Sequence, residues 1–75
     1  MSSTIYLSQN GYDNLKKELH TLKTVDRPHI INQIAEARDK GDLSENAEYD
    51  AAKEAQGLLE ARISKLENDL SNSRV

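Results

Sequence analysis

Two carboxylates near the middle of the chain, Asp42 and Glu45, have the type and spacing that can bind a divalent cation. Carboxylate oxygens are hard ligands that suit Mg²⁺, and one or two of them suffice where another molecule completes the coordination. The same spacing suits a helix start, because Asp42 could accept hydrogen bonds from backbone N–H groups while Glu45 reaches back toward the cap. Spacing alone favours capping over metal binding, but it does not decide between them, and both interpretations stay open.

The segment around this pair carries more acid than a helix cap requires. Between Glu36 and Asp50 there are six carboxylates and two cations, Arg38 and Lys40. Since a cap uses one or two carboxylates, the surplus favours attraction of a divalent cation that another molecule presents. The carboxylates belong to residues 36, 39, 42, 45, 48 and 50.

Helical periodicity predicts the elements that position this acidic turn, residues 41–46. Apolar residues recur at alternating spacings of three and four on both sides of it, which is typical of one helical face. Ser8 is a candidate N-cap, and Gly41 tolerates the left-handed conformation that commonly follows a helix end. We expect three helices, over about 8–25, 27–40 and 43–71.

The apolar repeat of the first arm loses phase by one residue close to Pro28. Proline lacks a donor N–H, and its ring disfavours helical angles at the preceding residue, Arg27. We therefore predict a break near Pro28, with Asp26 as the cap of a fresh helix.

The two apolar seams mirror each other around the acidic turn. In an antiparallel hairpin, opposed residues have a constant sum of residue numbers; here the sum is constant on each side of the Pro28 break and changes by one across it. The expected fold is therefore all-α, a long antiparallel α-hairpin (an intramolecular coiled coil) with a break near Pro28 in the first arm. The seam of the third helix comprises Tyr49, Ala52, Gln56, Leu59, Ile63, Leu66 and Leu70.

Composition limits the other classes of function. With 75 residues, 36% of them hydrophobic, and no cysteine, the chain is expected to form one small domain without disulfides or thiolate metal sites. No apolar run approaches the roughly 20 residues of a membrane span, and we expect a cytoplasmic location. The net charge of −3 argues against binding that depends on neutralising many phosphates.

Spacing argues against two kinds of metal site within the chain. Gly41 is third counted from Asp39, whereas an EF-hand loop needs glycine at its sixth position. His20 and His29 are the only histidines, so with no cysteine a tetrahedral zinc site lacks ligands.

One long motif, Gly41–Tyr49 (GDLSENAEY), is highly specific. Through it and several shorter matches that extend over essentially the whole chain, the sequence resembles the amino-terminal domain of bacterial Gre-type transcript cleavage factors. Residues 51–57 look like the GreA branch of this family and lack the cationic run expected of the GreB branch. The shorter matches are Gly11-Tyr12, Leu15, Glu18-Leu19, Arg27-Pro28, Ile30-Ile31, residues 34–38 and Arg62-Ile63.

The resemblance implies a transcription elongation factor whose coiled coil enters the secondary channel of bacterial RNA polymerase. There it would stimulate the polymerase's own cleavage of backtracked RNA at its 3′ end and rescue arrested complexes, without being an enzyme itself. Asp42 and Glu45 would be catalytic acids donated in trans that share Mg²⁺ with the polymerase, and the chain would have no cofactor of its own. The resemblance also implies residues that support the tip of the hairpin, meaning the end that carries the acidic turn: Ser44, Asn46, Glu48 and Tyr49. Candidate contacts with RNA or polymerase are Arg38, Lys40 and Lys53.

The family also carries a second, carboxy-terminal domain that docks on the polymerase, so we expect this chain to be an isolated domain that is monomeric in function. Two other hypotheses remain: a channel-binding inhibitor that does not stimulate cleavage, and a structural coiled coil that oligomerises through its seam.

Tyr49 lies on the seam opposite Ala37, which favours packing over stacking near the transcript. The basic residues are by default a solvated helix face.

Overall fold

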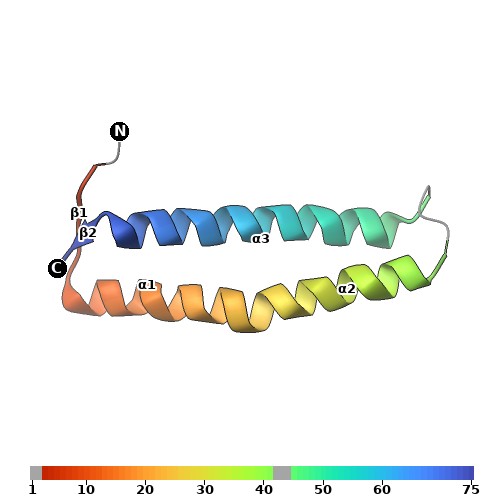
Figure 1. Cartoon of the computed structure of the whole chain (residues 1–75), viewed down its shortest axis with the longest axis horizontal. Helices are drawn as coiled ribbons and strands as arrows, with labels where there is room; N and C mark the ends of the chain where they lie inside the picture. The colour runs from red at the N-terminus through yellow and green to blue at the C-terminus, as the bar shows by residue number, and fades with distance from the viewer. Residues whose placement is uncertain (1–2, 42–44) are drawn as a thin grey trace.

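The chain forms one elongated hairpin of two helical arms that pack side by side (Figure 1). The computed structural model describes residues 3–41 and 45–75, and its principal dimensions are 49 × 25 × 12 Å. The all-α hairpin expected from the sequence is confirmed. The first arm consists of α1 (Gln9–Thr21), the π-helical turn η1 (Leu22–Asp26) and α2 (Arg27–Asp39), and the second arm is α3 (Ala47–Ser71).

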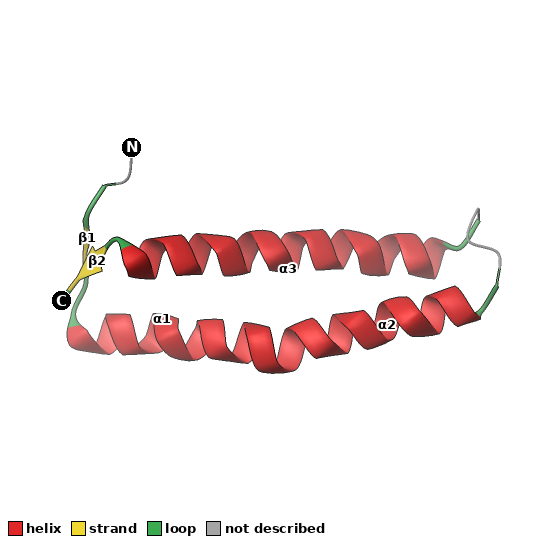
Figure 2. Cartoon of the chain, viewed as in Figure 1, coloured by secondary structure: helices red, strands yellow, loops and turns green. Residues whose placement is uncertain are grey.

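Both ends of the described chain meet at the base of the rod. There β1 (Ile5–Tyr6) pairs in parallel with β2 (Ser73–Arg74), drawn in yellow in Figure 2. The Ile5 backbone N–H donates to the Asn72 carbonyl at 2.9 Å. This short ladder, which was not predicted from the sequence, ties the start of the first arm to the end of the second.

Local signals set two of the helix ends. Ser8 is the N-cap of α1, and its hydroxyl accepts from the Gly11 N–H at 3.0 Å, as predicted. At the other end of the arm, Gly41 has φ +118°, and its N–H donates to the Arg38 carbonyl at 3.2 Å. The left-handed glycine expected after the second helix is therefore present.

The predicted break at Pro28 takes a different form, because the first arm remains helical through this region. Arg27 has φ −62° and ψ −50°, and Asp26 makes no side-chain cap hydrogen bond. The extra residue in the repeat is taken up by η1, in which the Arg27 N–H bonds to the Leu22 carbonyl five residues back. A proline ring collides with the carbonyl four residues back in a regular α-helix; the wider π turn relieves this collision, so no fresh start is needed.

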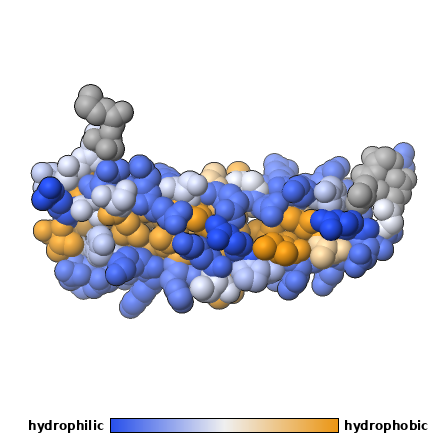
Figure 3. Space-filling view, viewed as in Figure 1, coloured by the Kyte–Doolittle hydropathy of each residue, from blue (hydrophilic) through white to orange (hydrophobic). Residues whose placement is uncertain are grey.

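The core is the seam between the arms. Ile63 and Leu66 are the deepest side chains, at 2% and 1% exposure. In the face that Figure 3 shows, apolar residues form a band along the middle of the rod with hydrophilic margins. Near the base, Leu15, Leu19 and Leu22 are only half-buried, because two helices alone cannot enclose them. The buried residues are Ile34, Ala37, Ala52, Leu59, Ile63 and Leu66.

Ion pairs link the arms along the margins of the seam. Arg27 forms a two-point pair with Glu60, with distances of 2.9 Å from Nε and 2.8 Å from Nη2 to the carboxylate oxygens. Hydrogen bonding to Glu60 raises the pKa of Arg27, and the same bonds lower the pKa of Glu60. Both side chains are partly exposed, so the pair contributes more to alignment than to stability. Two further pairs across the arms are Lys23–Glu67 and Glu18–Arg62.

In the part of the chain that the structure describes, none of the helices is long and apolar enough to cross a membrane.

Candidate functional site

The described residues of the predicted acidic turn, Gly41, Glu45 and Asn46, lie at the end of the rod opposite the chain termini (Figure 1). Glu45 is in a bend at this end, and its side chain is exposed. Asp42 and Ser44, the other predicted acid and a predicted supporting residue, lie outside the described residues. Glu45 therefore places one carboxylate where a second molecule can approach it.

The third helix starts later than the sequence predicted, at Ala47 instead of residue 43. Asn46 is extended (φ −91°, ψ 93°) and forms the N-cap, since its Oδ1 accepts from the Tyr49 N–H at 3.0 Å. Glu45 precedes this cap and does not lie in the first helical turn. Glu45 therefore does not cap α3, because Asn46 fills that role.

Asn46 also ties the two arms together at the tip. Its Nδ2 donates to the Ala37 carbonyl at the end of α2, within a partly buried contact. One amide thus serves both arms: its oxygen caps α3 and its nitrogen satisfies a carbonyl in the last turn of α2. This double use fixes the geometry of the segment that holds Glu45.

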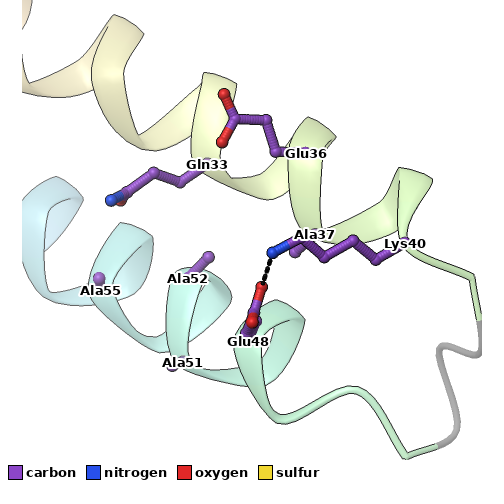
Figure 4. Close-up of a pocket in the computed structure, with 8 residues that line it drawn as sticks. All are labelled: Gln33, Glu36, Ala37, Lys40, Glu48, Ala51, Ala52 and Ala55. Atoms are coloured by element: carbon purple, nitrogen blue, oxygen red, sulfur yellow. Dashed lines mark hydrogen bonds and ion pairs between the residues drawn. The ribbon is translucent and has the colours of Figure 1, made fainter.

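A second cross-arm contact at the tip is an ion pair between Lys40 and Glu48, marked by the dashed line in Figure 4. The Lys40 Nζ lies 2.6 Å from Glu48 Oε2, and this hydrogen bond raises the pKa of Lys40. Both side chains are exposed, so water screens the pair. Lys40, the cation next to the acidic turn in the sequence, is thereby directed to Glu48, for which the resemblance implies a tip-supporting role.

Small side chains keep the rod thin behind the tip. Figure 4 shows a hollow between α2 and α3, with a volume of about 350 Å³. Four of its eight lining residues are alanines. Small side chains of this kind let two helix backbones approach closely. Its lining is Gln33, Glu36, Ala37, Lys40, Glu48, Ala51, Ala52 and Ala55.

The structure brings most of the described candidate residues together. A shallow hollow at the tip is lined by Lys40, Glu45, Asn46, Ala47 and Glu48. Tyr49 is half-buried beside the seam, consistent with the predicted packing role. The other two basic candidates do not line this hollow: Arg38 is exposed on α2, and Lys53 bonds Gln56 Oε1 at 3.1 Å on α3.

The donor set fits a metal ion that a second molecule also holds. Within residues 3–41 and 45–75, no group of three or more His, Cys, Asp or Glu side chains is placed to hold a metal ion alone. Glu45 offers carboxylate oxygens from an exposed position. Such oxygens can fill one or two coordination positions of a hard cation such as Mg²⁺, but they do not form a complete cage.

Replacing Asn46 tests the double role of this residue. Asn46→Ala removes both hydrogen bonds and should destabilise the chain by about 1 to 2 kcal/mol. Asn46→Asp keeps the cap acceptor but loses the donor to the Ala37 carbonyl, so its melting temperature should lie between those of the alanine variant and the unmodified chain. Circular dichroism melts measure this order. Equal melting temperatures for the two variants would show that the tie to Ala37 contributes the whole effect.

Comparisons with known proteins identify the family of this chain. Residues 5–75 match the family model described as transcription elongation factor, N-terminal. Over all 75 residues, the chain is 60% identical to transcription elongation factor GreA of Flavobacterium psychrophilum and 61% identical to that of Flavobacterium johnsoniae. It is 56% identical to the GreA of Chlorobaculum parvum. The alignments cover 100% of this chain and 47 to 48% of these proteins, so the chain spans about half the length of the curated relatives it matches.

Proposed function

The chain belongs to the N-terminal family of GreA and GreB transcription elongation factors, and from this membership we propose that it stimulates RNA polymerase to cleave backtracked RNA. The tip of the rod would enter the secondary channel of the polymerase and reach the RNA 3′ end. The observation that carries the proposal is the position of Glu45: it is exposed at the thin end of a long hairpin and is not used to cap α3.

The proposed chemistry needs few groups from this chain. Glu45, with Asp42 close to it in sequence, would give carboxylate oxygens to a cation that the polymerase also holds. Mg²⁺ bound there would supply the Lewis acidity that activates water and stabilises the leaving oxygen. Asn46 would fix the direction from which Glu45 approaches, because its two hydrogen bonds join the arms directly behind it. The chain alone would be inactive as a nuclease, and action on polymerase would place it in the cytoplasm.

Supporting roles are proposed for the remaining tip residues. Ser44, Asn46, Glu48 and Tyr49 would maintain the shape of the tip. Among the basic candidates, Lys40 is paired with Glu48, so Arg38 and Lys53 are better placed to contact RNA or polymerase. The arms bury their seam against each other within one chain, which supports a monomer over an oligomerising coiled coil. We further propose that a separate domain, within the half of the relatives that this chain does not span, docks on the polymerase.

A transcript-cleavage assay on stalled polymerase complexes tests this function. The 75-residue chain would be compared with a fusion of it to the remaining half of the Flavobacterium johnsoniae GreA, using polymerase from that organism. We expect both proteins to promote cleavage, with the chain needing a concentration about a hundredfold higher because it lacks the second attachment. If both proteins bind the stalled complexes and neither promotes cleavage, the inhibitor hypothesis replaces activation.

A further inference from the structure

The base of the rod contains a hollow that the tip chemistry does not use. It lies between α1, η1 and the end of α3, at the opposite end from Glu45, and its volume is about 340 Å³. We call the leucines that line it, one from each arm, its floor, and the two lysines and the histidine its basic rim. Among the described residues, no carboxylate lines it. The lining is Tyr12, Lys16, Leu19, His20, Lys23 and Leu70.

The basic rim follows from helical spacing. Lys16, His20 and Lys23 are four and three residues apart, so they share one face of the first arm. The Lys16 Nζ lies 5.6 Å from the centroid of the Tyr12 ring, a cation–π contact that leaves its positive charge in place. Lys23 is partly neutralised, since its Nζ lies 3.2 Å from a Glu67 oxygen. Lys16 is therefore the strongest point of attraction for an anion at this hollow.

We propose that this hollow binds an acidic polypeptide segment, with one apolar side chain of that segment on the floor and flanking carboxylates at the rim. The apolar floor, made by Leu19 and Leu70, offers no hydrogen-bond donor to a bare phosphate, but it can accommodate a Leu or Phe side chain. Charge complementarity would add attraction and specificity, because the basic rim would face the carboxylates of the segment. The net charge of −3 disfavours a nucleic acid as the occupant.

This hollow lies apart from the tip and would give the same rod a second point of attachment. Leu70 at the hollow lies in the last turn of α3 and Ala47 at the tip is its first residue, which places them about 35 Å apart at 1.5 Å rise per residue. A partner that receives the tip could therefore also hold the base through an acidic segment. Two contacts on one rigid rod raise the effective concentration of each.

The test is an NMR titration of the isotope-labelled 75-residue chain with a synthetic probe. The probe is a capped peptide of about a dozen Asp and Glu residues with one central Leu. We expect amide shifts confined to the hollow, and we expect them to weaken as added salt shortens the screening length from about 10 Å to about 3 Å. Matched probes are the same peptide with every acid amidated, and a single-stranded oligonucleotide of equal charge.

The chain offers a matched pair of variants. Lys16→Glu reverses a charge at the rim, whereas Lys17→Glu makes the same change on the neighbouring exposed residue, which does not line the hollow. We expect Lys16→Glu to weaken peptide binding about tenfold and Lys17→Glu to change it by less than about twofold, with circular dichroism confirming that both fold. Equal weakening by the two variants, or tighter binding of the oligonucleotide than of the acidic peptide, would overturn the proposal.

Discussion

Glu45→Gln should lower polymerase-dependent RNA cleavage by about a hundredfold or more in the fusion protein, with little change in its melting temperature. The side chain is exposed and precedes the N-cap of α3. Its amide analogue therefore disturbs neither packing nor capping, while it removes the negative charge that a divalent cation requires. Single-turnover cleavage of stalled complexes at saturating protein measures the loss.

Asp42→Asn should cause a similar loss, because the proposed cation takes oxygens from both acids. Asp50→Asn is the matched control, because it removes an exposed carboxylate from the first turn of α3, outside the proposed pair. Loss of this carboxylate affects only the interaction with the helix dipole. Cleavage by this variant should therefore stay within about threefold of the unmodified protein. Both tip variants should still compete for stalled complexes. Wild-type cleavage rates in Glu45→Gln and Asp42→Asn would show that these acids have no part in the chemistry.

Leu66→Ala is expected to destabilise the chain by about 2 to 5 kcal/mol, because Leu66 is only 1% exposed in the seam. A domain of this size has a total stability of about 4 to 11 kcal/mol. One substitution therefore removes a large share of it, and the melting temperature should fall by about 10 °C or more. Urea denaturation followed by circular dichroism gives the free energy directly.

Leu58→Ala provides the control on the same helix. Leu58 is 69% exposed, so the identical chemical change should cost less than about 0.5 kcal/mol. Leu19→Ala should give an intermediate loss because its side chain is half-buried. If Leu58→Ala were as damaging as Leu66→Ala, the seam would not be the main source of stability.

Much of the hairpin could be predicted because its signals are periodic or local. The seam of α3 repeats without interruption, and its members Leu59, Ile63 and Leu66 are buried as the pattern indicates. Ser8 and Gly41 act through contacts with residues close in sequence, which a pattern can indicate. The ladder of β1 and β2 could not be predicted, since two residues are too short to show a strand period.

The departures arise where a tertiary contact overrides a local rule. The rule for Pro28 predicts a break, but packing against α3 on both sides of it keeps the first arm helical and moves the adjustment into η1. The start of α3 is set by Asn46, whose side chain caps the helix and also reaches the Ala37 carbonyl across the arms. Local spacing contains no information about that cross-arm bond.

Candidate site residues were named from the sequence, but the contacts between them were not. Lys40 and Glu48 were both identified, yet their ion pair depends on how the turn folds back. The hollow at the base was missed because Tyr12 and Leu70 come from opposite ends of the sequence. Their approach follows only from the closed hairpin.

The π-helical turn Leu22–Asp26 marks a place where the chain can change length without changing shape. Deletion of one residue there would convert the turn to α-helix and join the apolar positions of α1 and α2 into one unbroken alternation of three and four. The inward-facing side of each half would stay the same, so the tip would keep its orientation relative to the base. A single-residue deletion in the first arm should therefore be tolerated in this turn and selected against elsewhere along the rod.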